Sequence, residues 1–328
     1  MDLLIAITLS LKPIIVSIKA CKRSTRYNIK NILKGHCFWC LRQEVLMQIL
    51  DGSALSSKIK EKITSEVKVL KDSTGNVPGL AVILVGNDPA SAAYVGMKKK
   101  ACDAVGFYSV THEMPYDISQ EAIEKTIEMM NENPNIDGIL IQLPLPKQIN
   151  TDRLLELVAP HKDVDGFHPY NVGRLTTGLE GFVPCTPLGV MKLLEEYKID
   201  VQGMNACVVG ASNIVGKPMA SLLLNANATV DICHIYTKDL KAHTLEADIL
   251  LVGVGVINLI KEDMVKEGAI IIDIGINRAD NGKLVGDVDF ENVSKKASYI
   301  TPVPGGVGPM TIAMLLQNTL QSAKNRQQ

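Results

Sequence analysis

A tyrosine and a lysine four residues apart form the first pair in this sequence that could do chemistry. Tyr94 and Lys98 lie in the segment from Ser91 to Val105, which is predicted to be a helix. A spacing of four places both side chains on one face of a helix. A lysine that is turned into a cleft at such a place can transfer protons. Lys98 also begins a run of three lysines, which is typical of a solvated helix face, so both interpretations stay open.

Polar side chains also occur at the end of an apolar strand and in an acidic segment. Gln142 falls at the carboxyl end of a predicted strand that is otherwise apolar from Ile139 to Leu143. Ligands of open α/β sheets gather at such ends; the alternative is an amide that is satisfied by nearby backbone. Asp163 and Asp165 are alternate residues, so only one of them can face a given side if the segment is extended.

A glycine-containing turn links a predicted strand to a predicted helix between Val208 and Gly216. Backbone N–H groups and the positive end of a helix can bind a phosphate at such a turn. Gly210, Ala211 and Ser212 are the residues that would approach it. The segment is not a full GxGxxG motif, so a simple strand-to-helix turn is the alternative.

The end of the next strand indicates which dinucleotide would bind. Sites that prefer NAD usually place an acidic residue there to hold the ribose hydroxyls. Here the strand ends in Tyr236, Thr237 and Lys238, and a hydroxyl with a cation suits a 2′-phosphate, so NADP is favoured. Asp231 has about the right spacing for NAD but lies inside the strand, and Asp239 could neutralise Lys238.

A rigid and glycine-rich loop runs from Pro302 to Pro309, immediately before the last predicted helix. Its glycines offer no side chain, so a flat ligand or another backbone segment can approach closely. The loop is therefore either a long structural turn or a binding loop. Cys185 lies in another turn that is fixed by proline, and nothing near it in sequence resembles a base for a nucleophile, so we expect an inert thiol.

The elements that must position these residues alternate between strands and helices from Met47 onward. This pattern predicts an α/β fold with mostly parallel sheets. The expected elements of the first half are strands 79–85, 107–112 and 136–143, helix 91–105, and a helix that is capped by Asp117 or Ser119 and ends at Asn133-Pro134. Those of the second half are helices 188–197 and 215–226 and strands 206–210, 229–235, 249–253 and 269–274.

These elements predict two domains joined by the segment 163–187. We expect a catalytic domain over residues 47–184, completed by a C-terminal helix at 309–323, and a Rossmann-type dinucleotide-binding domain over 185–308. Residues 1–46 form a separate extension. That extension has eight basic and two acidic residues, a net charge of +6, whereas the remainder carries −7.

Composition restricts the class of protein. The chain has 328 residues with 46% hydrophobic and 21% charged residues, which is typical of a globular protein. Its net charge of −1 gives no sign of nucleic-acid binding. The apolar run from Leu3 to Leu11 is far shorter than the roughly 20 residues that span a bilayer, so we expect no membrane segment.

The first 46 residues leave the location partly open. Their basic residues follow the apolar run, whereas those of a secretory signal precede it. The preferred interpretation is a dispensable extension before a working protein that begins at Met47 and is cytoplasmic. An organelle-targeting leader is the alternative. Sparse, irregular cysteines indicate a reducing compartment. Cys37 and Cys40 form one CxxC pair without a second, so no metal site is expected.

Taken together, the motifs resemble the bifunctional methylenetetrahydrofolate dehydrogenase/methenyltetrahydrofolate cyclohydrolase family, bacterial type. The resemblance covers about residues 47 to 322. It depends on six segments in one order, which are Tyr94 to Lys98, Asp137 to Pro146, Lys162 to His168, Gly210 to Gly216, Asp273 to Asn277 and Pro302 to Pro309.

The resemblance implies a folate cleft between the two domains, NADP as the cofactor and a homodimer. It implies a substrate site made of Tyr94, Lys98, Gln142, Asp165 and the loop residues Pro304, Gly305 and Gly306. It also implies that Gly210, Ala211, Ser212 and Ile276 contact NADP, and we add Thr237 from the strand end described above. The alternatives are a dehydrogenase without cyclohydrolase activity, an amino-acid or shikimate-type dehydrogenase, and a non-catalytic dinucleotide-binding module.

Overall fold

The structure is a computed structural model that describes residues 47–326. The predictions made for residues 1–46, including the extension, the leader and the CxxC pair, lie outside the described residues. Residues 47–326 belong to one structural unit. None of the described helices is long and apolar enough to cross a membrane.

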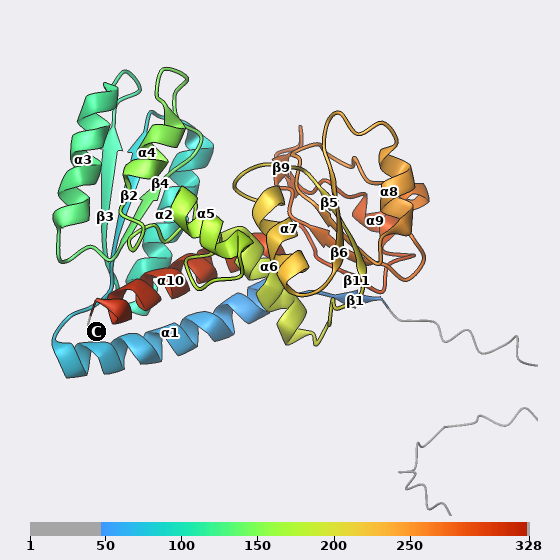
Figure 1. The fold of residues 1–328 in the computed structure, drawn as a ribbon, viewed down its shortest axis with the longest axis horizontal. Helices are drawn as coiled ribbons and strands as arrows, with labels where there is room; N and C mark the ends of the chain where they lie inside the picture. Colours follow the sequence, from blue (N-terminus) through green and yellow to red (C-terminus); the bar gives the residue numbers. More distant parts are fainter. Residues whose placement is uncertain (1–46, 327–328) are drawn as a thin grey trace, which may run out of the picture. The chain divides into compact units, whose positions relative to one another are not determined.

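The first sheet has three parallel strands in the order β3-β2-β4 (Figure 1). They are β2 (Gly79–Val85), β3 (Tyr108–Met114) and β4 (Gly138–Ile141). The central strand β2 is a continuous apolar run that is buried at every position, as expected for a parallel strand that is covered on both faces. The chain places β3 on one side of β2 and then β4 on the other, so the carboxyl ends of β2 and β4 meet at a switch point where ligands bind in open sheets.

The second sheet has six parallel strands in the order β1-β11-β8-β7-β5-β6. Its strands are β1 (Gln48–Ile49), β5 (Asn205–Val209), β6 (Thr229–Cys233), β7 (Ile249–Val252), β8 (Ile270–Asp273) and β11 (Tyr299–Ile300). A short antiparallel pair, β9 (Asn277–Arg278) with β10 (Leu284–Val285), follows β8. The chain moves from β5 to β6 and then to the other side of β5, which creates a second switch point between β5 and β7.

Ten α-helices and one 3₁₀ helix occur among residues 47–326. They are α1 (Gly52–Thr74), α2 (Pro89–Val105), α3 (Gln120–Glu132), α4 (Thr151–Leu157), α5 (Pro169–Thr176), α6 (Cys185–Glu196), α7 (Gly216–Asn225), α8 (Leu240–Glu246), η2 (Glu262–Met264), α9 (Phe290–Val293) and α10 (Val307–Asn325). The predicted α/β fold with mostly parallel sheets is confirmed.

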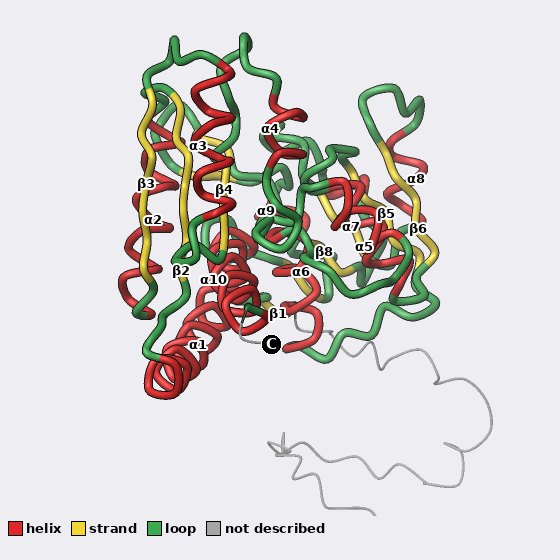
Figure 2. Tube along the Cα trace, turned by 60° about the vertical axis from the view of Figure 1, so that its left-hand side comes forward, coloured by secondary structure: helices red, strands yellow, loops and turns green. Residues whose placement is uncertain are grey.

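Two long helices connect the sheets. Helices α1 and α10 lie side by side, and α10 also packs against α6 (Figure 2). Helix α1 was not predicted from the sequence, although Asp51 caps its start and Gly75 ends it in a left-handed conformation. Its buried residues Leu55, Ile63 and Val67 recur at helical spacing, and this was the signal that could have found it.

Several predicted boundaries differ from the structure. Strand β6 ends at Cys233 rather than at residue 235, because His234 and Thr237 close a turn: the Thr237 N–H donates to the His234 carbonyl at 2.8 Å, and the His234 N–H donates to Thr237 Oγ1 at 2.9 Å. Residues 48 and 49 belong to the first domain of the predicted division but pair with β11 in the second sheet.

The packing of α10 predicts a specific loss of stability. Leu316 on α10 is fully buried, so Leu316→Ala removes buried methyl groups and leaves a cavity. We expect a loss of about 3 kcal/mol in the free energy of unfolding, measured by urea denaturation. The matched change Leu179→Ala, at an exposed leucine, should cost less than about 0.5 kcal/mol. Equal losses in the two variants would show that α10 is not part of the core.

Candidate active site

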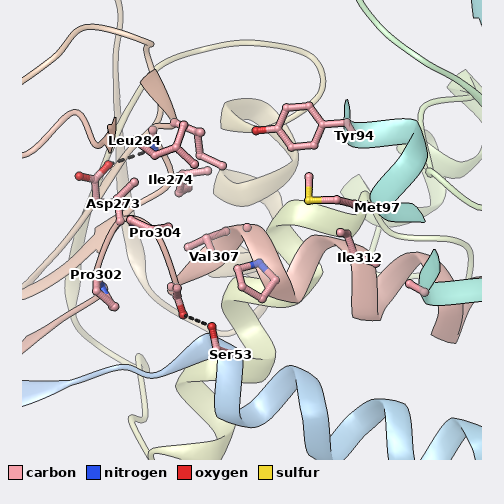
Figure 3. A pocket seen from close by; sticks show the side chains of 18 of the residues that line it. Ser53, Tyr94, Met97, Asp273, Ile274, Leu284, Pro302, Pro304, Val307 and Ile312 are labelled. Carbon is pink, nitrogen blue, oxygen red and sulfur yellow. Dashed lines mark hydrogen bonds between the residues drawn. The ribbon is translucent and has the colours of Figure 1, made fainter. Parts of the chain in front are cut away.

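A pocket of about 750 Å³ opens between the two sheets. Figure 3 shows Tyr94 and Met97 extending from α2 on one side of it, with Ile274 and Pro304 across from them. The pocket therefore joins the helix that carries Tyr94 to the loops that follow the strands of the second sheet. Its other lining residues include Ser53, Ile276, Gly305, Gly306 and Ile312.

Helix α2 presents Tyr94 and Lys98 because its start and end are both fixed. The Asp88 carboxylate accepts a hydrogen bond from the Ser91 N–H at 2.7 Å, and the helix ends at Gly106 in the left-handed conformation. Tyr94 and Lys98 are both partly buried, one turn apart on the same face. The next two lysines in the run are exposed, so only Lys98 departs from the solvated face.

The Lys98 ammonium contacts the end of strand β4. Its Nζ donates a hydrogen bond to Gln142 Oε1 at 2.9 Å. The Gln142 amide is held in turn, because its Nε2 donates to the Leu143 carbonyl at 2.8 Å. That second bond leaves Oε1 as the amide atom that faces the lysine. Lys98 is thus held at the carboxyl end of the sheet and not in bulk solvent.

Asp165 is the third charged group of this cluster. Burial raises the pKa of its carboxyl, while the nearby Lys98 ammonium and a hydrogen bond with the Cys185 thiol lower it. The Cys185 Sγ also lies 3.4 Å from the Val164 carbonyl. Sequence reasoning treated Cys185 as inert and did not anticipate its contact with Asp165.

Asp163 has a different position from Asp165. Its carboxylate accepts hydrogen bonds from the Phe167 and His168 N–H groups at 3.1 and 2.9 Å and from Asn171 Nδ2 at 2.8 Å. Burial nonetheless raises its pKa to about 6. Asp163 therefore closes the turn that presents Asp165, in agreement with the expectation that only one of the two faces a given side.

A buried amide fixes the same turn from the other end of the chain. Asn318 on α10 donates from Nδ2 to the carbonyls of Val164 and Val183, at 2.9 and 3.1 Å. No spacing in the sequence pointed to this residue. A Cβ on Gly166 would meet the Pro184 nitrogen at 2.6 Å, and its φ is +75°, so the close approach of these segments requires glycine there.

The glycine turn after β5 packs backbone segments closely against one another. Gly210 has a φ of +120°, and a Cβ there would lie 2.5 Å from the Gly253 carbonyl oxygen. A Cβ on Gly216 would lie 1.9 Å from the Gly210 carbonyl oxygen. Ser212 Oγ accepts from the Val215 N–H at 3.1 Å at the start of α7, which leaves the hydroxyl proton free to donate.

The structure brings some predicted site residues together and leaves others apart. Tyr94, Ile276 and the loop residues Pro304, Gly305 and Gly306 line one pocket, and Lys98, Gln142 and Asp165 form a cluster one helical turn from Tyr94. Four predicted cofactor residues, which are Gly210, Ala211, Ser212 and Thr237, lie outside that pocket on the loops after β5 and β6.

Comparison with protein families identifies two matching segments. Residues 50–165 match the catalytic domain of the tetrahydrofolate dehydrogenase/cyclohydrolase family, and residues 184–327 match its NAD(P)-binding domain. The two parallel sheets, the glycine turn and the pocket between them thus define a two-domain α/β dehydrogenase. The chain belongs to the tetrahydrofolate dehydrogenase/cyclohydrolase family, and the family resemblance of the sequence is confirmed.

Individual relatives agree with this assignment. The "Bifunctional protein FolD" of Sulfurimonas denitrificans is 80% identical over 278 residues, covering 85% of this chain and 98% of its own length. The solved bifunctional FolD of Campylobacter jejuni is 58% identical with a TM-score of 0.84, over 85% of this chain and 99% of that chain. The Trypanosoma brucei enzyme, solved with NADP and an inhibitor, is 38% identical with a TM-score of 0.82. This match covers 85% of the present chain and 98% of the Trypanosoma brucei chain.

The environment of Cys185 predicts a low chemical reactivity. Its thiol is buried, and burial together with the neighbouring Asp165 raises its pKa, so little thiolate forms near neutral pH. We expect iodoacetamide at pH 8 to alkylate Cys185 more than about tenfold more slowly in the folded protein than in urea. Peptide mass mapping distinguishes it from the other cysteines. Equally fast alkylation in both conditions would contradict this environment.

Proposed function

We propose that this chain oxidises 5,10-methylenetetrahydrofolate with NADP and then hydrolyses the methenyl product to 10-formyltetrahydrofolate. The observation that carries the proposal is the hydrogen bond from Lys98 to Gln142 beside the Tyr94 pocket. In this proposal residues 47–184 and helix 309–323 bind the folate, and residues 185–308 bind NADP. Family membership supports both activities.

The residues of the glycine turn fit NADP. Gly210 and Gly216 leave no space for a Cβ, and the Ser212 hydroxyl oxygen accepts from N–H groups at the start of α7. The hydroxyl proton and the N-terminal end of α7 then face a phosphate, which favours an anion there. Ala211 and Ile276 complete the cofactor contacts in this proposal.

The strand end after β6 favours NADP over NAD. The Asp231 carboxylate, which has about the spacing of an NAD-binding acid, pairs with His243 on α8. The Asp239 carboxylate accepts from the Ala242 N–H at 3.1 Å and so caps α8. Lys238 forms no ion pair among the described residues and is available, with the Thr237 hydroxyl, to a 2′-phosphate.

In the oxidation, the protein mainly orients the substrate. NADP, when bound, supplies the hydride acceptor. Tyr94 stacks on or orients the folate ring, the Asp165 carboxylate accepts hydrogen bonds from the pterin, and the backbone of Pro304, Gly305 and Gly306 lets the flat ring approach. The folate nitrogens stabilise the positive charge that remains on the one-carbon unit, so this step needs no strong base. Orientation at near-attack distance is the main contribution of the protein.

In the hydrolysis, Lys98 transfers the protons. The neutral amine accepts a proton from water as the water oxygen bonds to the methenyl carbon. The ammonium then gives that proton to the leaving nitrogen as the carbon–nitrogen bond breaks. The remaining hydroxyl proton is released to solvent as the carbonyl of the formyl group forms on the other nitrogen. Gln142 Oε1 orients Lys98 throughout, because the amide is itself held by the Leu143 carbonyl.

The alternatives account for fewer of the contacts. A dehydrogenase without cyclohydrolase activity does not need the Lys98 ammonium to be held by an oriented amide. A non-catalytic dinucleotide-binding module would not need Tyr94 and Lys98 on one face of α2 beside the pocket. The oriented lysine therefore favours the bifunctional enzyme.

The proposal includes a homodimer that acts in the cytoplasm. Strand β6 lies at the edge of the six-stranded sheet, and Leu224, Ile232 and Ile235 are exposed on and near it. An open edge with apolar side chains is suited to pairing with a second copy. The four described cysteines are free and buried, which is compatible with a reducing compartment.

Replacing the lysine should separate the two activities. We expect Lys98→Met to lower cyclohydrolase activity by at least about 100-fold, because general acid–base catalysis is lost, while NADPH formation from methylenetetrahydrofolate falls much less. Absorbance of NADPH measures the first step, and the decay of methenyltetrahydrofolate absorbance measures the second. The matched control Lys99→Met changes an exposed lysine that pairs with Asp103 and should keep both activities. Normal hydrolysis by Lys98→Met would refute the assigned role.

Removing the serine hydroxyl should weaken cofactor binding selectively. We expect Ser212→Ala to raise the KM for NADP by about tenfold, since a hydrogen bond to a charged phosphate is lost, with a smaller effect on the KM for the folate. Steady-state kinetics with each substrate varied in turn measures this. Ser221→Ala, which removes a hydroxyl that bonds only within α7, is the control. An unchanged KM for NADP would count against phosphate binding at the glycine turn.

A further inference from the structure

A second cluster of reactive side chains lies on β5, β6 and α8 and shares no residue with the Lys98 cluster. Asp231, Cys233 and His243 each direct one ligand atom to the same place, and these three atoms all lie within 4.8 Å of one another. The Cys207 Sγ lies 3.8 Å from the Cys233 Sγ. Neither the oxidation nor the hydrolysis uses any of these four groups.

The fold assembles this cluster from three elements. Asp231 and Cys233 are two residues apart on β6 and so face the same side of the sheet. Cys207 on β5 is paired in register with Asp231, which directs its thiol to that side as well. His243 comes from α8, which packs against β5 and β6 (Figure 1). No spacing in the sequence reveals the set, and the expectation of no metal site was based on the single CxxC pair of Cys37 and Cys40.

We propose that Asp231, Cys233 and His243, with Cys207 as the fourth ligand, bind a divalent zinc-type cation. Two thiolates, one imidazole and one carboxylate form a set of ligands that zinc accepts. The ligand atoms of Asp231, Cys233 and His243 lie within 4.8 Å of one another, and Cys207 joins them through its 3.8 Å separation from Cys233 Sγ, so its thiol is the donor nearest to completing a tetrahedral set.

The separation of the two sulfurs fits a metal better than a disulfide. Two sulfurs that are each about 2.3 Å from a tetrahedral zinc lie about 3.8 Å apart, which matches the separation of the Cys207 and Cys233 sulfurs. A disulfide requires about 2.05 Å and therefore a large approach of neighbouring strands. The Asp231 carboxylate and His243 Nδ1 are closer than two ligands of one zinc and must separate, while the Cys207 thiol must approach them.

The charges of the cluster also fit a cation. The Asp231 carboxylate and His243 Nδ1 are hydrogen bonded, and a metal would replace the proton between them. Asp231 is exposed and His243 is half-buried, which gives an ion a path from solvent to the buried sulfurs.

Cobalt(II) tests the site by a signal that does not depend on enzymatic activity. The full chain is used with Cys21, Cys37 and Cys40 changed to serine, so that thiols outside the described residues do not contribute. One equivalent of Co²⁺ should give intense tetrahedral d–d bands and a thiolate charge-transfer band, and one equivalent of Zn²⁺ should displace it. Only weak octahedral bands, without charge transfer, would overturn the proposal.

Single variants then test each ligand. Cys207→Ser and Cys233→Ser should each remove about half of the charge-transfer intensity, and an unchanged spectrum in either would overturn the four-ligand arrangement. Asp231→Asn and His243→Gln alter exposed or half-buried side chains and should fold; each should weaken Co²⁺ binding by at least about tenfold. Cys102→Ala, at a buried thiol on α2, is the control and should leave the spectrum unchanged; loss of the bands in that variant would also contradict the site.

Discussion

The orientation of one side-chain amide is the constraint on which the proposed chemistry depends. Gln142 can offer either an oxygen or an NH₂ group to Lys98, and only the oxygen accepts from an ammonium. The Leu143 carbonyl decides between them, because it binds the NH₂ group. The parallel strand β4 places that amide at its carboxyl end, where α2 supplies the lysine. Among residues 47–326 the hydrogen bond to Gln142 is therefore the contact that orients the lysine.

Hydrogen bonds from neighbouring elements also fix the turn that contains Asp163 and Asp165. The Val164 carbonyl receives hydrogen bonds from Asn318 on α10 and from Cys185 at the start of α6. Asp163 closes the turn from the other side. Asp165 can therefore remain partly buried next to Lys98 while its neighbours satisfy the backbone. One of these contacts, from Asn318 to Val164, joins residues that are 154 positions apart in the sequence.

Much of the fold could be predicted from the sequence because parallel strands have a strong local signature. Buried runs such as the one that forms β2 are continuous and apolar, and the helices between them start at recognisable caps such as Ser119. Boundaries were less certain: β6 ends two residues early because a turn between His234 and Thr237 forms instead. Such turns depend on single side-chain hydrogen bonds, which hydrophobic patterns do not reveal.

The candidate site could be predicted only as far as motifs and resemblance allowed. The contact of Lys98 with Gln142 was expected from the family resemblance alone, because the pairing of β2 with β4 that brings Gln142 to this edge is specified by no local pattern. Asn318 and the cluster of Asp231, Cys233 and His243 were missed, since their partners come from distant elements. Residues whose function depends on tertiary neighbours have no signature in spacing.

Strand β1 has a further consequence for how the chain can be divided. Only residues 48 and 49 form it, yet they complete the edge of the nucleotide-binding sheet before the chain begins the folate-binding half. Helix α10 returns in the opposite sense, leaving the nucleotide-binding half to pack on α1. The polypeptide therefore crosses between the two halves more than once. A gene fragment that encodes either half alone would leave an unpaired strand at the sheet edge or an apolar helix face without its packing partner. A chimera of two relatives should therefore fold only when β1 and α10 are both taken from the same parent as the elements they pack against.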